Sequence, residues 1–235
     1  MVGKIKNMVQ EYFFNEMSKS KNDYFFYIIE EDDMEKRHEK YGCDYRISLP
    51  EFKNSFVSIV IINKYSNQIV FATSIILYNE NNLDYIHFWR FDQDQKILKK
   101  ISLIDILKAS EFGKSAITLG FSKGEKNFRG KLEISRNFIY LIQRIIVETK
   151  HFVFMECTGT QYLDNNLINQ EQISLSILND EVNSCQIGTT RNESIPAEKF
   201  FKLIGLTKSQ NIFNKRTLGG VYFDRRYLEK NKEHR

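Results

Sequence analysis

A loop rich in glycine and in cations is the clearest place where this chain could bind an anion. It runs from Ser122 to Lys131 and follows an apolar, strand-like stretch at 116–121. Backbone N–H groups at the start of a helix attract anions, and glycines let an anion approach the backbone closely. The loop therefore predicts a phosphate cradle, although a solvated basic turn in front of a helix would have the same composition.

Glu156 offers acid–base chemistry. It lies near the end of a predicted strand at 152–158, where a carboxylate can take a proton from an amine directly or through water. A strand-end salt bridge is the structural alternative. His87 and Trp89 would face one side of another predicted strand at 84–91, where they either line a pocket for an acceptor or pack in the core.

The cysteines predict neither a disulfide framework nor a metal site. Cys43, Cys157 and Cys185 are far apart, with no CxxC pair and no histidine at ligand spacing. This usage is typical of a reducing compartment, so we expect a cytoplasmic protein. Cys157 precedes Thr158 and two further small residues, a context that suits either a nucleophile or a buried thiol.

Composition limits the classes of function. The 235 residues suit one large domain, 1–235, and 42% hydrophobic residues suffice for a folded core. The net charge of +4 is too mild to favour a nucleic-acid partner. No run of about 18 apolar residues predicts a membrane span, and the N-terminus lacks the apolar region of a signal peptide.

Hydrophobic periodicity predicts an alternation of strands and helices. The expected strands cover 24–29, 56–62, 69–77, 84–91, 116–121, 152–158, 211–215 and 220–223. The expected helices cover 8–17, 34–41, 101–112, 131–149 and a short segment from Pro196 to Gly205, with a helix or irregular cover at 164–180.

This order of elements resembles the GNAT fold of N-acetyltransferases over most of residues 23–228. Two segments carry the likeness. Asn127-Phe128-Arg129-Gly130-Lys131 stands before the long helix, and residues 197–206 resemble the helix that ends in an aromatic-x-x-x-Gly-Phe pattern. The resemblance implies an α/β (α+β) class, with a central, mixed but mostly antiparallel sheet flanked by helices.

The resemblance also implies acyl-coenzyme A, either acetyl-CoA or a longer acyl form, as cosubstrate, with no metal. Its pyrophosphate would lie on backbone N–H groups of the loop and helix start. Carried over to this chain, the donors would be Lys126, Phe128, Arg129, Gly130, Lys131 and Leu132.

The chain departs from the family pattern at several positions. Leu132 stands where the family has a glycine, and Ile134 where it has a small residue. Phe201 replaces the tyrosine that often protonates the departing thiolate, so Tyr222 and Tyr162 become candidate proton donors. These departures imply a different acyl donor, an altered mechanism or lost catalysis.

Residues 26–41 and the following hairpin also resemble the autoinducer-synthase and N-acyl amino acid synthase branch, whose members can take acyl chains from an acyl carrier protein. The leading hypothesis is an N-acyltransferase that acts on a small-molecule amine, with Glu156 as base. The alternative is a non-enzymatic ligand-binding protein on the same fold.

Overall fold

Contacts divide the chain into two compact units. The computed structural model describes residues 2–19, 23–29, 45–108, 115–120, 123–124, 132–157, 164–177, 198–215 and 218–225. Unit 1 comprises Met1–Asn82 and Ala116–His151, and unit 2 comprises Leu83–Ser115 and Phe152–Arg235. The expectation of one domain over 1–235 stays a prediction.

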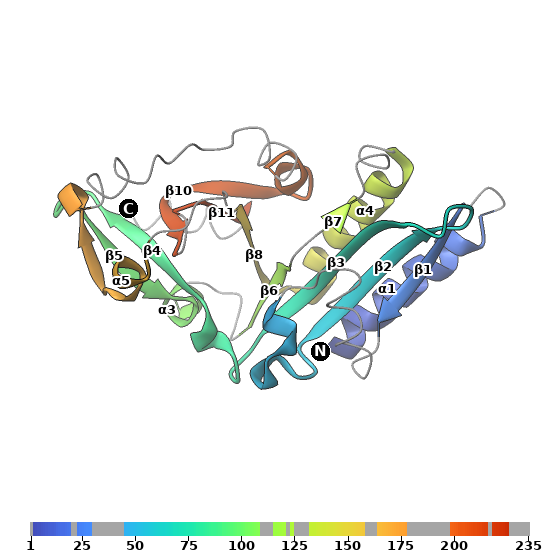
Figure 1. Cartoon of the computed structure of the whole chain (residues 1–235), viewed down its shortest axis with the longest axis horizontal. Coiled ribbons are helices and arrows are strands. Elements are labelled where there is room, and N and C mark those ends of the chain that lie inside the picture. The colour runs from blue at the N-terminus through green and yellow to red at the C-terminus, as the bar shows by residue number, and fades with distance from the viewer. Residues whose placement is uncertain are drawn as a thin grey trace. The chain divides into compact units, whose positions relative to one another are not determined.

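Unit 1 holds a sheet of antiparallel strands in the order β1-β2-β3-β6, with β7 also paired to β3 (Figure 1). Its elements are α1 (Val2–Met17), β1 (Tyr24–Ile29), η2 (Tyr45–Ser48), η3 (Pro50–Phe52), β2 (Phe56–Asn63), β3 (Ile69–Tyr78), β6 (Ala116–Leu119), β7 (Lys123–Gly124) and α4 (Leu132–Thr149). The predicted hairpin at 56–77 is confirmed. The predicted helix at 34–41 lies outside the described residues.

The β2–β3 turn is closed by Asn63, whose side-chain oxygen accepts hydrogen bonds from the backbone N–H groups of Tyr65 and Ser66 at 3.0 and 2.9 Å. Asparagine is frequent in turns because its carboxamide bonds to nearby backbone in this way. Asn67 then takes a left-handed φ of 53°, which asparagine tolerates better than most residues. A short polar sequence between two apolar runs thus sets the hairpin.

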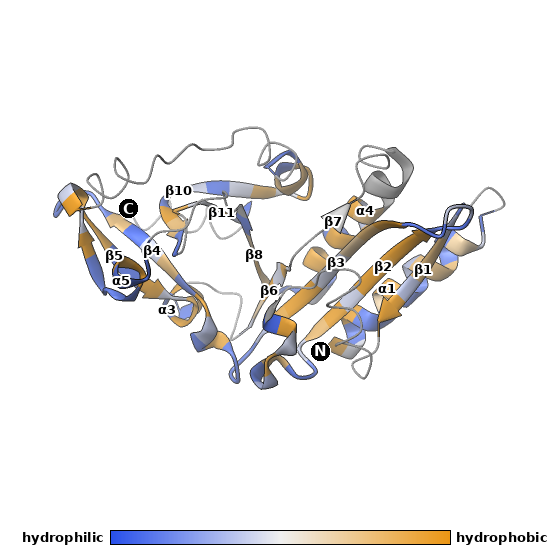
Figure 2. Cartoon of the chain, in the orientation of Figure 1, coloured by the Kyte–Doolittle hydropathy of each residue, from blue (hydrophilic) through white to orange (hydrophobic). Residues whose placement is uncertain are grey.

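One face of this sheet packs on α1 and α4. Phe26, Ile61 and Phe71 are register partners on adjacent strands and so share that face. Phe13 of α1 contacts Phe26 with ring centroids 5.3 Å apart, and Phe138 of α4 contacts Phe71 at 5.0 Å. Figure 2 shows the apolar colouring of β2 and β3, and burial of these strands stabilises the unit.

Unit 2 holds antiparallel strands in the order β8-β11-β10-β4-β5-β9. Its elements are η4 (Leu83–Tyr85), β4 (His87–Asp92), β5 (Ile97–Ser102), α3 (Leu103–Lys108), β8 (Phe152–Cys157), α5 (Asn165–Asn169), β9 (Gln172–Ser174), β10 (Leu206–Asn214) and β11 (Gly220–Asp224). Residues 198–203 are also helical. Together with unit 1, these elements confirm the predicted class, a mixed α/β fold of mostly antiparallel strands flanked by helices.

Several elements of unit 2 differ from the prediction. The strand β9 lies within 164–180, which was expected to be a helix or irregular cover, and β10 begins at Leu206 instead of 211. The helix expected at 101–112 starts only at Leu103, because Ile101 and Ser102 belong to the strand β5 that the periodicity missed. Ser102 and Asp105 form a capping box, in which the Ser102 hydroxyl accepts from the Asp105 N–H and the Asp105 carboxylate accepts from the Ser102 N–H, both at 3.1 Å. The strand expected at 84–91 starts at His87, after the 3₁₀ turn η4.

We expect acidification to destabilise the protein through His151, a buried residue after α4. Burial, followed by nearby positive charge, lowers the pKa of His151 from its ordinary 6.5. The unfolded chain therefore binds more protons near and below pH 6.5, so this stability is present above that pH and is lost as the pH falls. The measurement is the free energy of unfolding in urea between pH 7.5 and 5.

His151→Gln should flatten this pH dependence without removing it, because burial also lowers the pKa of His87 in unit 2. His87→Gln, measured alongside, separates the two contributions. An unchanged slope in His151→Gln would exclude His151 as a source of the acid sensitivity.

Candidate functional site

Glu156 lies near the end of β8 and is held by a side chain from another strand. The amide Nδ2 of Asn214, at the end of β10, donates a hydrogen bond to Oε1 of Glu156. Asn214 is only 7% exposed, whereas Glu156 is half-buried. A carboxylate that is fixed through one oxygen and partly open to solvent can still accept a proton.

The sheet face that carries Glu156 is strongly apolar. We call it the aromatic face, defined by Phe88, Phe152, Phe154 and Phe223, all fully buried. Phe88 contacts Phe154 with centroids 5.5 Å apart, and Phe152 contacts Phe223 at 5.6 Å. The strand period of two puts Glu156 on the side of Phe154, and Asn214 is the register partner of Phe88. The polar pair therefore sits among large apolar side chains.

Tyr222 points to the opposite side of the sheet. It pairs in register with Met155, whereas Glu156 pairs with Val221, and adjacent strand residues face opposite ways. Tyr222 is fully buried, and its ring contacts that of Phe201 with centroids 5.1 Å apart. The structure thus brings Tyr222 beside Phe201 but does not bring it together with Glu156, and its catalytic role stays a prediction.

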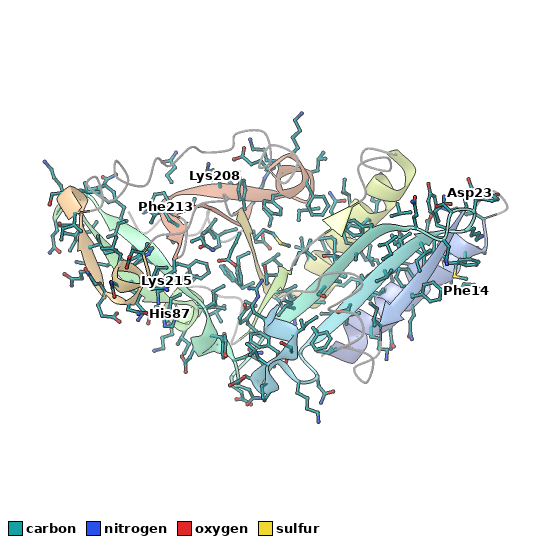
Figure 3. The ribbon with its side chains drawn as sticks, viewed as in Figure 1. Phe14, Asp23, His87, Lys208, Phe213 and Lys215 are labelled. Carbon is teal, nitrogen blue, oxygen red and sulfur yellow. The ribbon has the colours of Figure 1, made fainter. Side chains whose placement is uncertain are left out.

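Lys208 shares the face of Tyr222, its register partner on β11. Its side chain lies over Gly220, where an added Cβ would stand 2.7 Å from the Lys208 Cε. The ammonium is 3.6 Å from a carboxylate oxygen of Glu198. Figure 3 labels Lys208 on β10, together with Phe213 further along the strand. A glycine at 220 thus leaves space for the lysine to cross β11.

Trp89 belongs to the core of unit 2. It is fully buried and packs with Leu98, Leu167 and Ile173. Its indole Nε1–H donates to the backbone oxygen of Lys215 at 2.9 Å. Of the two predicted roles for Trp89, acceptor pocket or core, the structure favours the core.

His87 lies two residues before Trp89, on the same side of β4, within a group of charged side chains (Figure 3). Burial lowers the pKa of His87, the positive charges of Lys100 and Lys215 lower it further, and the carboxylates of Glu171 and Asp84 oppose the shift. Lys100 is itself paired with Glu171 at 2.5 Å. Near neutral pH His87 is therefore a neutral imidazole, which can accept a proton or a hydrogen bond.

Most of the predicted anion loop lies outside the described residues. This applies to Lys126, Phe128, Arg129, Gly130 and Lys131, and also to the alternative proton donor Tyr162. Leu132 is the first residue of α4, so the helix begins where the loop ends. The backbone of Cys157 ends β8.

Asn214 and Lys208 do not stand out in the sequence pattern. Both lie on β10, whose predicted range, 211–215, omitted its first five residues. An asparagine at the end of an apolar strand is typical of a turn, and only its position five residues before the Gly219-Gly220 pair indicated a hairpin. Which carboxylate it would meet depends on strand order.

Within the described ranges, no group of three or more His, Cys, Asp or Glu side chains could hold a metal ion. None of the helices that the structure describes is long and apolar enough to cross a membrane.

No protein-family model and no curated protein matches the chain. Solved structures do match. They include subunit AI of the arginine/ornithine succinyltransferase from Pseudomonas aeruginosa, at 12% identity and a TM-score of 0.41 over 82% of this chain and 67% of that one. They also include FeeM, an N-acyl amino acid synthase from uncultured soil microbes, at 11% identity and a TM-score of 0.42 over 86% of this chain and 90% of that one.

A third match is the spermidine N-acetyltransferase from Vibrio cholerae in complex with CoA and spermine, at 8% identity and a TM-score of 0.36 over 88% of this chain and 98% of that one. At these identities and TM-scores, what those proteins bind and transform is said of them alone.

The Trp89–Lys215 bond predicts a measurable loss on substitution. Trp89→Phe keeps an aromatic ring but removes the indole donor to the part-buried Lys215 carbonyl. We expect the free energy of unfolding to fall by roughly 1 kcal/mol or more, because a typical intramolecular hydrogen bond contributes about 0.5–1.5 kcal/mol and the smaller ring also loses packing in the core. Urea unfolding followed by circular dichroism measures it.

Tyr65→Phe is the matched control, since it removes the exposed hydroxyl that donates to Asp23 at 3.2 Å. That change should cost less than about 0.5 kcal/mol, as for other surface substitutions. Equal losses in the two variants would mean that the indole bond does not stabilise unit 2.

Proposed function

We propose that this protein is an N-acyltransferase, which moves an acyl group from a thioester to a small-molecule amine. The observation that carries the proposal is the carboxylate of Glu156, half-buried beside the aromatic face and hydrogen-bonded by Asn214. Amine acylation needs a base because a protonated amine has no lone pair for attack. Glu156 is in a position to serve as that base.

The proposed reaction balances without a metal or redox cofactor. Glu156 takes one proton from the ammonium form of the acceptor, and the amine nitrogen attacks the thioester carbonyl carbon. A C–N bond forms, the C–S bond breaks, and the thiolate leaves with the electron pair. The second proton that the nitrogen loses then protonates the thiolate. Holding both substrates in one orientation supplies much of the rate enhancement in such reactions.

The thioester donor is proposed to be acyl-coenzyme A, bound through its phosphates by the basic loop. Lys126, Phe128, Arg129, Gly130, Lys131 and Leu132 would supply backbone N–H groups and positive charge. The start of α4 at Leu132 supports this assignment, because the loop then leads directly into a helix N-terminus. An acyl carrier protein is the alternative donor, and the cytoplasm is the proposed compartment.

Phe201 favours a second candidate, a non-enzymatic ligand-binding protein. It is buried against Tyr222 and has no hydroxyl to protonate a leaving thiolate. A protein of this kind would bind a thioester without turnover. Steady-state assays with a broad panel of amines distinguish the two candidates.

Reversing the charge of the loop should abolish donor binding. Arg129→Glu places a carboxylate where the proposal needs a cation, so we expect no detectable heat with acetyl-CoA, coenzyme A or a long-chain acyl-CoA in isothermal titration. Lys64→Glu, which reverses a charge on the exposed β2–β3 turn, is the control and should bind as the wild type does. Unchanged affinity in Arg129→Glu would reject the loop as the donor site.

Removing the proposed base should slow chemistry and spare binding. Glu156→Gln keeps the size of the side chain but cannot take a proton, so kcat should fall about 10²- to 10⁴-fold while donor affinity stays the same. Glu80→Gln, at an exposed position after β3, controls for loss of an acidic group. Full activity in Glu156→Gln would assign the base elsewhere.

A further inference from the structure

Asn214 makes a buried, charge-assisted contact whose partner is the proposed base. Its side chain is 7% exposed, and its amide N–H donates to Glu156 Oε1 across the intervening strand β11. A carboxylate accepts hydrogen bonds from an amide more strongly than a neutral oxygen does. The contact therefore restricts the rotation of the Glu156 carboxylate.

The backbone holds Asn214 in place. Its N–H donates to the Gly219 oxygen at 3.0 Å, and its own oxygen accepts from the Leu218 N–H at 3.1 Å. The next residue, Lys215, is fixed by the indole of Trp89. Because Asn214 is tied down on both sides, the amide sets the position of the carboxylate rather than following it.

We infer that Asn214 is a positioning residue for acyl transfer: it holds one carboxylate oxygen of Glu156 so that the other oxygen takes the amine proton. The inference rests on the proposed function, in which Glu156 is the base. Asp224, a buried carboxylate among the described residues, lies at the far end of β11, three residues beyond the Glu156 partner Val221. The pairing of Asn214 with Glu156 thus follows from strand register.

Kinetics of Asn214→Leu test the inference. The substitution keeps the size and removes the donor, so kcat should fall about tenfold to a hundredfold with little change in KM for the amine, as expected for loss of a hydrogen bond to a charged group. The acid limb of the pH–rate profile should move to higher pH. Gln210→Leu, which removes an exposed amide on the same strand, should leave both unchanged.

A double variant separates positioning from a general structural effect. If Asn214 acts through Glu156, adding Asn214→Leu to Glu156→Gln should slow the reaction no further, because the interaction is already removed. A further tenfold loss in the double variant would overturn the inference. Thermal unfolding by circular dichroism checks that each variant is folded.

Carboxyl ¹³C NMR of Glu156, assigned by comparison with Glu156→Gln, tests the contact without substrate. In Asn214→Leu the resonance should titrate at higher pH than in the wild type. If the leucine variant does not fold, Asn214→Asp gives the same readout, because two adjacent carboxylates retain a proton to higher pH. Unchanged titration in the variant would overturn the inference. If the titration shifts in the variant but the wild-type protein has no transferase activity, only the proposed function is rejected.

Discussion

Antiparallel hydrogen bonding in unit 2 decides which side chains can act together. The register pairs Glu156 with Val221 and Met155 with Tyr222. Because adjacent residues of a strand face opposite sides, Glu156 and Tyr222 lie on opposite faces of the sheet. The pairing of β10 with β4 places Asn214 opposite Phe88, near the start of β4. Asn214 therefore faces the same side of the sheet as Glu156. A slip by one residue would exchange these faces and separate the pair.

The β10–β11 turn transmits this constraint to the site. Its backbone bonds fix Asn214, and the indole of Trp89 fixes Lys215 from the core side. A fully buried aromatic residue and a half-buried carboxylate are therefore linked through two adjacent residues of one strand end. Packing in the core and geometry at the polar pair are consequently not independent.

The sequence was sufficient to predict most regular elements of the described chain. Apolar runs predicted β1, β2 and β3, and apolar residues spaced three and four apart predicted α4, all close to their observed bounds. Each of these elements depends on its own burial pattern. It missed β5, because Ile97–Ser102 has two adjacent apolar residues followed by two adjacent lysines and so lacks the alternation of a half-buried strand. Glu156 was recognised from its place at a strand end.

Long-range pairing explains what the sequence could not predict. Asn214 and Glu156 are separated by 58 positions, and only the strand order β8-β11-β10 brings them into contact. The opposite facing of Tyr222 likewise depends on register and not on local pattern. Such contacts form only when the strands pair in the folded sheet, so no local stretch of the sequence predicts them.

Trp89 is the one tryptophan of the chain, and its indole bonds to the residue next to Asn214. Indole emission responds to the polarity and hydrogen bonding around the ring. The protein therefore carries an intrinsic fluorophore within unit 2, and its indole is hydrogen-bonded to the residue that follows Asn214, whose amide holds the proposed base. Ligand binding that disturbs this strand end could be followed by light emission, without any attached label.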